Sequence, residues 1–147
     1  HGMDAKVIAE RGAELLALME LTKAASDLVA DYSHGMRKKL ALAAALLPGP
    51  RILFLDEPFE GVDAISSRQI KDLLQSFARR GGTIFLTSHV LEVVQALADH
   101  VGIIHQGRLV AQAPLAELLR GSTLEALFLE LVGASAAPSR SLEWLSG

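Results

Sequence analysis

Two short runs of apolar residues constrain the fold of this chain more than any other feature. Residues 52–55 read Ile-Leu-Phe-Leu, and residues 83–87 read Thr-Ile-Phe-Leu-Thr. Continuous apolar runs are typical of strands that are buried on both faces of a parallel sheet. Between the two runs, residues 64–80 predict a long helix that Gly81-Gly82 ends. The order strand, helix, strand predicts an α/β fold with a parallel sheet.

The rest of the chain predicts further helices and one hairpin. Apolar residues at helical spacing indicate an amphipathic helix over residues 5–21. Ser33 can cap a second helix that runs to about residue 47, where Pro48-Gly49-Pro50 ends it. After the second strand we expect a helix to about residue 98, a hairpin that turns at Gln106-Gly107, and short helices near residues 114–119 and 124–132.

Composition excludes several classes of protein. The 147 residues are 50% hydrophobic and 21% charged, which suits a globular chain with one sizeable core. A formal net charge of -3 gives no indication of a nucleic-acid partner. The chain has no cysteine, so disulfides and thiolate metal sites are excluded. The longest apolar stretch, residues 40–47, is far shorter than the ~20 residues that span a bilayer.

Polar residues directly follow each of the two apolar runs. Asp56-Glu57 comes after the first run, and Ser88-His89 comes after the second. In sheets with crossover connections, ligands bind at the carboxyl ends of the parallel strands. Solvated charges at an exposed strand end would produce one such cluster, but two clusters at one sheet edge favour an active site.

These residues differ in the chemistry that they can supply. The carboxylate of Asp56 suits Mg²⁺, and that of Glu57 suits a general base or a group that orients water, typically worth ~10²–10⁴ in rate. His89 follows a buried strand at the same edge, which favours a catalytic or phosphate-contacting role over that of an ordinary surface histidine. A hydrolase dyad of Ser88 and His89 is disfavoured, because neighbours at a strand end point apart.

A third polar motif lies at the predicted start of the second helix. Residues 32–36 read Tyr-Ser-His-Gly-Met. Free N–H groups and the helix dipole favour anions at such a point. Ser33 offers a hydroxyl, and Gly35 allows a phosphate to approach the backbone closely. An ordinary helix cap with a tolerated glycine would look the same, and the cations at 37–39 fit a solvated face, a site near phosphate or a site near an acidic partner.

Together these residues resemble the nucleotide-binding domain of ABC ATPases, from about residue 5 to residue 133. Residues 32–36 are similar to the signature motif, usually LSGGQ, and residues 52–57 to the Walker B strand with its catalytic glutamate. Residues 61–63, Gly-Val-Asp, are similar to the D-loop, and His89 is similar to the switch histidine. The resemblance is specific because four motifs occur in the family's order and spacing.

The resemblance implies a partial P-loop NTPase fold of the ABC type. Residues 1–50 would form the helical subdomain with the signature helix. Residues 51–133 would form the C-terminal half of the parallel-sheet core, and residues 134–147 a tail or linker. No G-x-x-x-x-G-K-[ST] phosphate loop occurs in the 147 residues. We therefore expect a part of a longer domain that by itself hydrolyses no ATP and that self-associates through its incomplete sheet.

Two residues of the signature-like motif depart from the usual form. His34 stands where the motif usually has its first glycine, and Met36 stands where it usually has glutamine. The variant Tyr-Ser-x-Gly-Met resembles the branch that serves two-component exporters, often for drugs, polysaccharides or antibiotics. Residues 122–133 are similar to the end of the ATPase subunit in that branch.

The same resemblance implies cofactors and catalytic roles. The cofactors would be ATP and Mg²⁺, with Asp56 as the metal ligand. Glu57 and His89 would act on the ATP that is bound by the same chain.

It also implies partners. Two ATPase domains would pair head to tail, so that Ser33 and Gly35 contact the γ-phosphate of ATP on the second subunit. Asp63 would couple the two sites across the interface. The further partner would be a transmembrane permease, which places the protein in the cytoplasm on the inner face of the cell membrane. No nucleic-acid partner is expected.

Two other functions fit parts of the sequence. One is a soluble ABC ATPase of the DNA-repair or translation type, although neither a long coiled-coil insertion nor a basic patch is visible in the sequence. The other is a non-enzymatic interaction module, which would hold if the missing half of the domain is absent in the cell.

Overall fold

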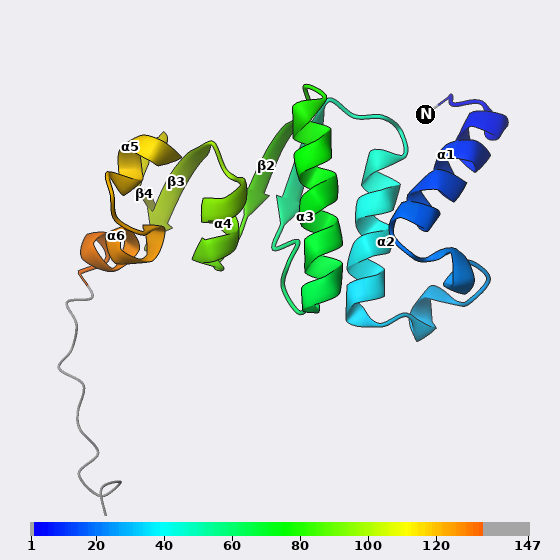
Figure 1. The fold of residues 1–147 in the computed structure, drawn as a ribbon, viewed down its shortest axis with the longest axis horizontal. Helices are drawn as coiled ribbons and strands as arrows, with labels where there is room; N and C mark the ends of the chain where they lie inside the picture. Colours follow the sequence, from blue (N-terminus) through cyan, green and yellow to red (C-terminus); the bar gives the residue numbers. More distant parts are fainter. Residues whose placement is uncertain (1, 134–147) are drawn as a thin grey trace, which may run out of the picture. The chain divides into compact units, whose positions relative to one another are not determined.

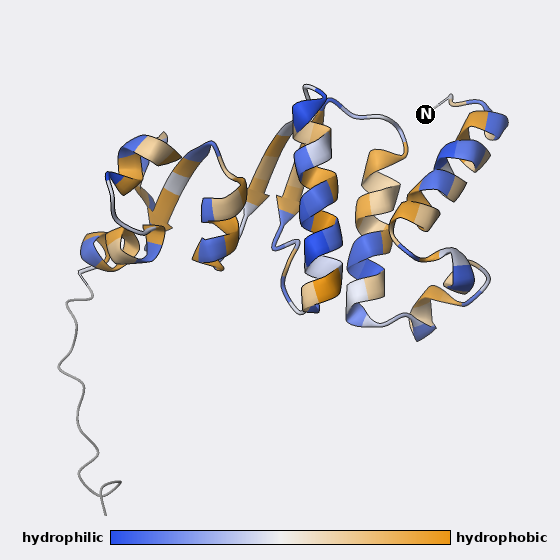
Figure 2. Cartoon of the chain, in the orientation of Figure 1, coloured by the Kyte–Doolittle hydropathy of each residue, from blue (hydrophilic) through white to orange (hydrophobic). Residues whose placement is uncertain are grey.

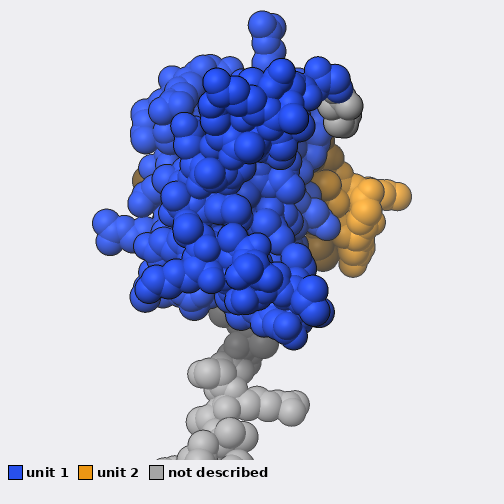
Figure 3. Space-filling view, turned by 90° about the vertical axis from the view of Figure 1, so that its right-hand side faces the viewer, with its two compact units in different colours: residues 1–89 blue, residues 90–147 orange. Residues whose placement is uncertain are grey.

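The computed structural model describes residues 2–133 of the chain. The chain divides into two compact units, residues 1–89 and 90–147, which Figure 3 colours separately. The expected boundary between residues 50 and 51 falls inside the first unit and stays a prediction, and the expected tail, residues 134–147, lies outside the described residues. Within residues 2–133, no helix has both the length and the apolar character needed to cross a membrane.

The first unit contains a parallel strand pair joined by a crossover helix. Strands β1 (Ile52–Asp56) and β2 (Thr83–Thr87) pair in parallel, with Ile52 opposite Thr83 and Asp56 opposite Thr87. Helix α3 (Ala64–Arg79) connects them and lies against β2 (Figure 1). Helices α1 (Ala5–Leu18) and α2 (His34–Leu46) precede the strands, with the single turns η1 (Thr22–Ala24) and η2 (Val29–Asp31) between them. The predicted α/β order is confirmed.

Side-chain caps fix where α2 and α3 begin. The Met36 N–H donates to Ser33 Oγ at 3.1 Å, which confirms Ser33 as the N-cap of α2. Asp63 caps α3 in the same way, because its Oδ1 accepts from the N–H groups of Ile65 at 3.0 Å and Ser66 at 2.9 Å. Each cap satisfies N–H groups that have no partner inside the helix.

Among residues 2–133, the strands are covered on one face only, in contrast to the burial on both faces that the apolar runs predict. Alternate side chains of a strand point to opposite faces. Leu53 is buried, whereas Phe54 on the opposite face is 76% exposed and Phe85 beside it is 62% exposed. Their ring centroids are 5.8 Å apart. Both strands are apolar along most of their length in Figure 2. An apolar run shows that a strand can be buried on both faces, but the neighbouring elements decide whether both faces are covered.

Buried side chains from α2, α3 and the loops support this strand pair on the side opposite the exposed face. Ile70 and Leu74 of α3 are each 1% exposed. The Tyr32 hydroxyl donates to the Ala24 carbonyl at 2.6 Å and ties η2 to the end of η1. The other buried apolar residues of the first unit are Met19, Leu21, Leu42, Ala43, Leu53 and Phe59.

The second unit is a hairpin with helices around it. Its elements are α4 (Leu91–Leu97), β3 (His100–His105), β4 (Arg108–Pro114), α5 (Leu115–Leu119) and α6 (Leu124–Leu131). Strands β3 and β4 are antiparallel, and the predicted turn at Gln106-Gly107 is confirmed, with positive φ at both residues. Val101, Ile103 and Leu124 form the core, and the Leu124 N–H donates to Gln95 Oε1 at 3.0 Å.

Candidate functional site

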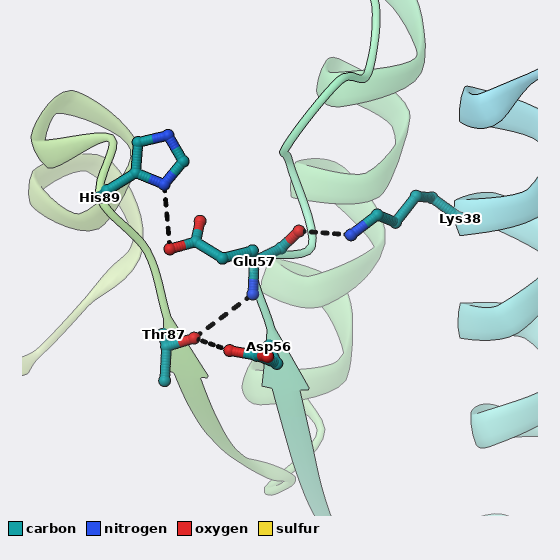
Figure 4. Close-up of polar contacts among 5 residues, drawn as sticks. All are labelled: Lys38, Asp56, Glu57, Thr87 and His89. Atoms are coloured by element: carbon teal, nitrogen blue, oxygen red, sulfur yellow. Dashed lines mark hydrogen bonds and ion pairs between the residues drawn. The ribbon is translucent and has the colours of Figure 1, made fainter.

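The carboxyl ends of β1 and β2 bring three polar residues together. Asp56 lies opposite Thr87 in the parallel register. The Thr87 hydroxyl donates to Asp56 Oδ1 and accepts from the Glu57 N–H at 3.3 Å (Figure 4). The Glu57 N–H also donates to the Thr87 carbonyl at 3.2 Å. Thr87 therefore fixes both acidic residues to the neighbouring strand. Thr87 is a site residue that the sequence pattern did not indicate, although the parallel register places it opposite Asp56.

Glu57 and His89 form a direct pair. Glu57 Oε1 lies 3.0 Å from His89 Nδ1, and the side chains are 27% and 66% exposed. The hydrogen bond to Glu57 and the charge of Glu57 raise the pKa of His89 above its ordinary value of 6.5, with a smaller contribution from Glu60. The second carboxylate oxygen of Glu57, Oε2, is buried and has no hydrogen-bond partner among the described residues. It is therefore available to accept a proton or a hydrogen bond.

The backbone of Glu57 has an unusual conformation. Its φ is +44°, in the left-handed region that L-residues rarely adopt. Its carbonyl oxygen accepts from Lys38 Nζ of α2 at 2.7 Å (Figure 4). Non-glycine residues in this region persist where surrounding contacts hold them, often at functional sites.

A second group of predicted residues lies where α2 and α3 begin. Gly35 is buried, and a Cβ at this position would lie 3.4 Å from Asp63 Oδ2, 3.7 Å from Ser66 Oγ and 4.0 Å from Ser33 Oγ. Hydrogen bonds from the backbone and side chain of Ser66 lower the pKa of Asp63. The structure thus brings Ser33, Gly35 and Asp63 together and gives Gly35 a packing role next to Asp63.

His34 links this second group to the loop that follows β1. Its Nε2 lies 3.1 Å from the Glu60 carbonyl oxygen. A Cβ on Gly61, whose φ is +65°, would lie 2.9 Å from His34 Cδ2. The imidazole that replaces the usual signature glycine therefore contacts the loop that leads to Asp63.

The cations of the first turn of α2 all have protein acceptors. Lys38 binds the Glu57 carbonyl, and Arg37 donates to the Tyr32 carbonyl. Lys39 is 7% exposed and donates to Gln69 Oε1 at 3.3 Å. The sequence left open whether these cations lie next to phosphate. Because each has a protein acceptor, the position of each side chain has a structural explanation that does not require phosphate.

The donor set at the strand ends is compatible with Mg²⁺. Asp56 is exposed, and one of its oxygens already receives the Thr87 hydroxyl. Residues 2–133 contain no group of three or more His, Asp or Glu side chains that could hold a metal by themselves. Mg²⁺ commonly binds one or two carboxylates together with waters and substrate phosphates. The single exposed carboxylate of Asp56 fits that pattern.

Comparison with known proteins identifies the family. A family model described as "AAA domain, putative AbiEii toxin, Type IV TA system" matches residues 24–94. The bacitracin transport ATP-binding protein BcrA of Bacillus licheniformis is 42% identical over 106 residues, which are 71% of this chain and 35% of that protein. A fluoroquinolones export ATP-binding protein of Mycobacterium tuberculosis is 43% identical over 67% of this chain and 33% of its own length. The chain thus spans about a third of the length of these curated relatives.

Solved structures agree with these relatives. The structure of an ATP-binding subunit of an ABC transporter matches with a TM-score of 0.80 at 28% identity, over 88% of this chain and 56% of that one. An ATP-binding cassette of another ABC transporter matches in fold, with a TM-score of 0.69 at 20% identity over 84% of this chain and 49% of its own. The predicted fold and the resemblance drawn from the motifs are confirmed: the chain belongs to the family of ABC transporter ATP-binding proteins and carries part of their ATPase fold.

Proposed function

We propose that the protein carrying this chain is the ATP-hydrolysing subunit of an ABC transporter and drives transport through a membrane permease. The observation that carries the proposal is the Asp56, Glu57 and His89 cluster at one sheet edge, with Glu57 Oε2 buried and unpartnered among the described residues. The names of the relatives, which refer to bacitracin transport and fluoroquinolone export, support transport and favour export.

Glu57 would act on the attacking water. One carboxylate oxygen is engaged by His89, and the other, which is buried and has no hydrogen-bond partner among the described residues, would accept a hydrogen bond from water and then its proton once the site admits the water. His89 keeps the carboxylate in one orientation and is the group beside it that can donate a hydrogen bond to phosphate. Because the pKa of His89 is raised, a larger share of its rings is protonated near neutral pH than in an unpaired histidine.

Asp56 would hold Mg²⁺, with Thr87 fixing the orientation of its carboxylate. When bound, Mg²⁺ would supply positive charge to the phosphate oxygens of ATP. Thr87 contributes by keeping Asp56 and Glu57 at a fixed spacing, since its hydroxyl contacts both residues.

The residues at the start of α2 would act on a second subunit. In this proposal two copies pair head to tail, and Ser33 with Gly35 contacts the γ-phosphate of ATP held by the partner. Asp63, which lies against Gly35, would transmit changes between the sites. Attachment to a permease would place the protein on the inner face of the cell membrane.

The test is Glu57→Gln in the protein as its gene encodes it. Glutamine keeps the size of glutamate and can still hydrogen-bond His89, but it cannot take a proton from water. We expect Mg²⁺-dependent phosphate release to fall by at least ~10², while ATP binding, measured with a fluorescent nucleotide, stays within a few-fold.

The matched control is Glu10→Gln, which removes one exposed carboxylate from α1. It should leave phosphate release unchanged. Retention of activity in Glu57→Gln would remove Glu57 from the mechanism, and absence of ATP hydrolysis in the wild-type protein would refute the proposed function. The isolated 147 residues should release no phosphate, because they contain no phosphate-loop motif.

A further inference from the structure

Both peptide groups that flank the Glu57 Cα are held by other parts of the chain. On the amino side, the Glu57 N–H donates to the carbonyl and the hydroxyl of Thr87. On the carboxyl side, the Glu57 carbonyl accepts from Lys38 Nζ at 2.7 Å and from the Glu60 N–H at 3.2 Å. Fixing the two peptide planes fixes φ and ψ, so these contacts together set the left-handed conformation of Glu57.

We propose that Lys38 is a positioning residue for Glu57: from α2 it holds the Glu57 carbonyl and thereby aims the Glu57 carboxylate at His89. The contact is charge-assisted, because an ammonium donates to a carbonyl oxygen, and such bonds are shorter and stronger than neutral ones. Its catalytic consequence rests on the proposed function, whereas its geometric consequence for Glu57 and His89 does not.

The environment of Lys38 supports a defined position for the side chain. Lys38 is half-buried and lines a hollow between α2 and β1, together with Ala41, Leu42 and Leu55. Its apolar stem can lie along these residues while the ammonium reaches the carbonyl. The contact joins positions 19 residues apart in sequence.

The contact also connects two parts of the site. Lys38 lies three residues after Gly35 on α2, so the helix that begins at Ser33 also binds the backbone of Glu57. A movement of α2 away from β1 would therefore remove the Lys38 contact and leave the Glu57 carbonyl with the Glu60 N–H as its remaining donor. The strained backbone would then be free to relax, and the carboxylate would lose its fixed orientation toward His89.

The experiment compares Lys38→Met, Lys38→Arg and Lys23→Met in the protein as its gene encodes it. Met removes the donor, Arg retains one, and Lys23 is an exposed lysine of η1 that serves as the charge control. The first measurement is the titration of His89, followed by NMR of ¹³C-labelled histidine. The sign is informative, because removal of a nearby cation alone raises a histidine pKa, whereas loss of the Glu57 carboxylate lowers it.

We expect the pKa of His89 to fall toward 6.5 in Lys38→Met and to stay raised in Lys38→Arg and Lys23→Met. The second measurement is steady-state ATP hydrolysis. Misplacement of a catalytic group by about 1 Å can cost ~10²-fold in rate. We expect kcat to fall by roughly 10- to 100-fold in Lys38→Met with KM for ATP within about twofold, and to recover largely in Lys38→Arg.

An unchanged or higher His89 pKa in Lys38→Met would overturn the proposal, and so would a raised KM with unchanged kcat. If the wild-type protein hydrolyses no ATP, the proposed function fails, but the titration still decides the role of Lys38. If thermal melts show that Lys38→Met does not fold, Lys38→Gln takes its place with the same expectations. The polar glutamine side chain suits a half-buried position and is too short to keep the contact with the Glu57 carbonyl.

Discussion

The contact between His34 and Gly61 can be measured with two substitutions. Gly61 has φ +65°, and an L-residue there costs about 1–2 kcal/mol. In Gly61→Ala the new Cβ would also lie 2.9 Å from His34 Cδ2 and 3.1 Å from Nε2, so the ring must turn away. Turning breaks its contact with the Glu60 carbonyl, worth about 0.5–1.5 kcal/mol. Gly61→Ala should therefore destabilise the chain by roughly 1.5–3.5 kcal/mol.

The same substitution should cost less when the ring is already absent. In a His34→Ala background only the backbone term remains, so Gly61→Ala should cost about 1–2 kcal/mol. The difference predicts a coupling energy of about 0.5–1.5 kcal/mol between the two positions. It measures how firmly the start of α2 is attached to the loop that leads to Asp63.

The assay is urea unfolding, followed by circular dichroism, of the wild type, Gly61→Ala, His34→Ala and the double variant. The control is Gly81→Ala, because Gly81 has φ +88° and a Cβ there would meet no atom within 4 Å. Its cost should be the same with and without His34. If the effects of Gly61→Ala and His34→Ala add within ~0.3–0.5 kcal/mol, the ring does not lie against Gly61, and the reasoning is refuted.

Three further predictions follow from the same structure. Asp63→Ala should cost about 1 kcal/mol through loss of the α3 cap, and Asp63→Asn much less, in urea unfolding at neutral pH; equal losses would argue against capping. Because the pKa of His89 is raised above 6.5, its pairing with Glu57 contributes fully below that pH and is lost as pH rises through the folded value. His89→Gln should therefore destabilise the chain more near about pH 5.5 than near about pH 8.5, and a pH-independent loss would contradict the pair. The 147-residue chain should self-associate at micromolar concentration in light scattering, and Phe54→Ser with Phe85→Ser should reduce this, because both rings lie exposed on one face; a monomeric wild-type chain would contradict it.

The sequence was sufficient to predict which acidic and imidazole groups meet. The two apolar runs specify adjacent strands, and the connecting helix makes them parallel. The carboxyl ends of adjacent parallel strands lie at one edge, so the residues that follow them, Asp56-Glu57 and Ser88-His89, had to come close. The cap at Ser33 was predictable for a similar reason, because it depends on contacts within four residues. Local rules and chain direction fix these features.

The supporting contacts depended on the tertiary structure. The sequence left the role of Lys38 open between a solvated face, a place near phosphate and a place near an acidic partner, and the structure gives it the Glu57 carbonyl. The contact of His34 with Glu60 and Gly61 joins segments 26 residues apart. The apolar run itself, which suits burial on both sides, did not predict the open face at Phe54, although the missing phosphate loop predicted an incomplete sheet. Partners of this kind follow from how helices pack beside strands, and packing is set by the shapes of many side chains together rather than by the pattern of any one segment.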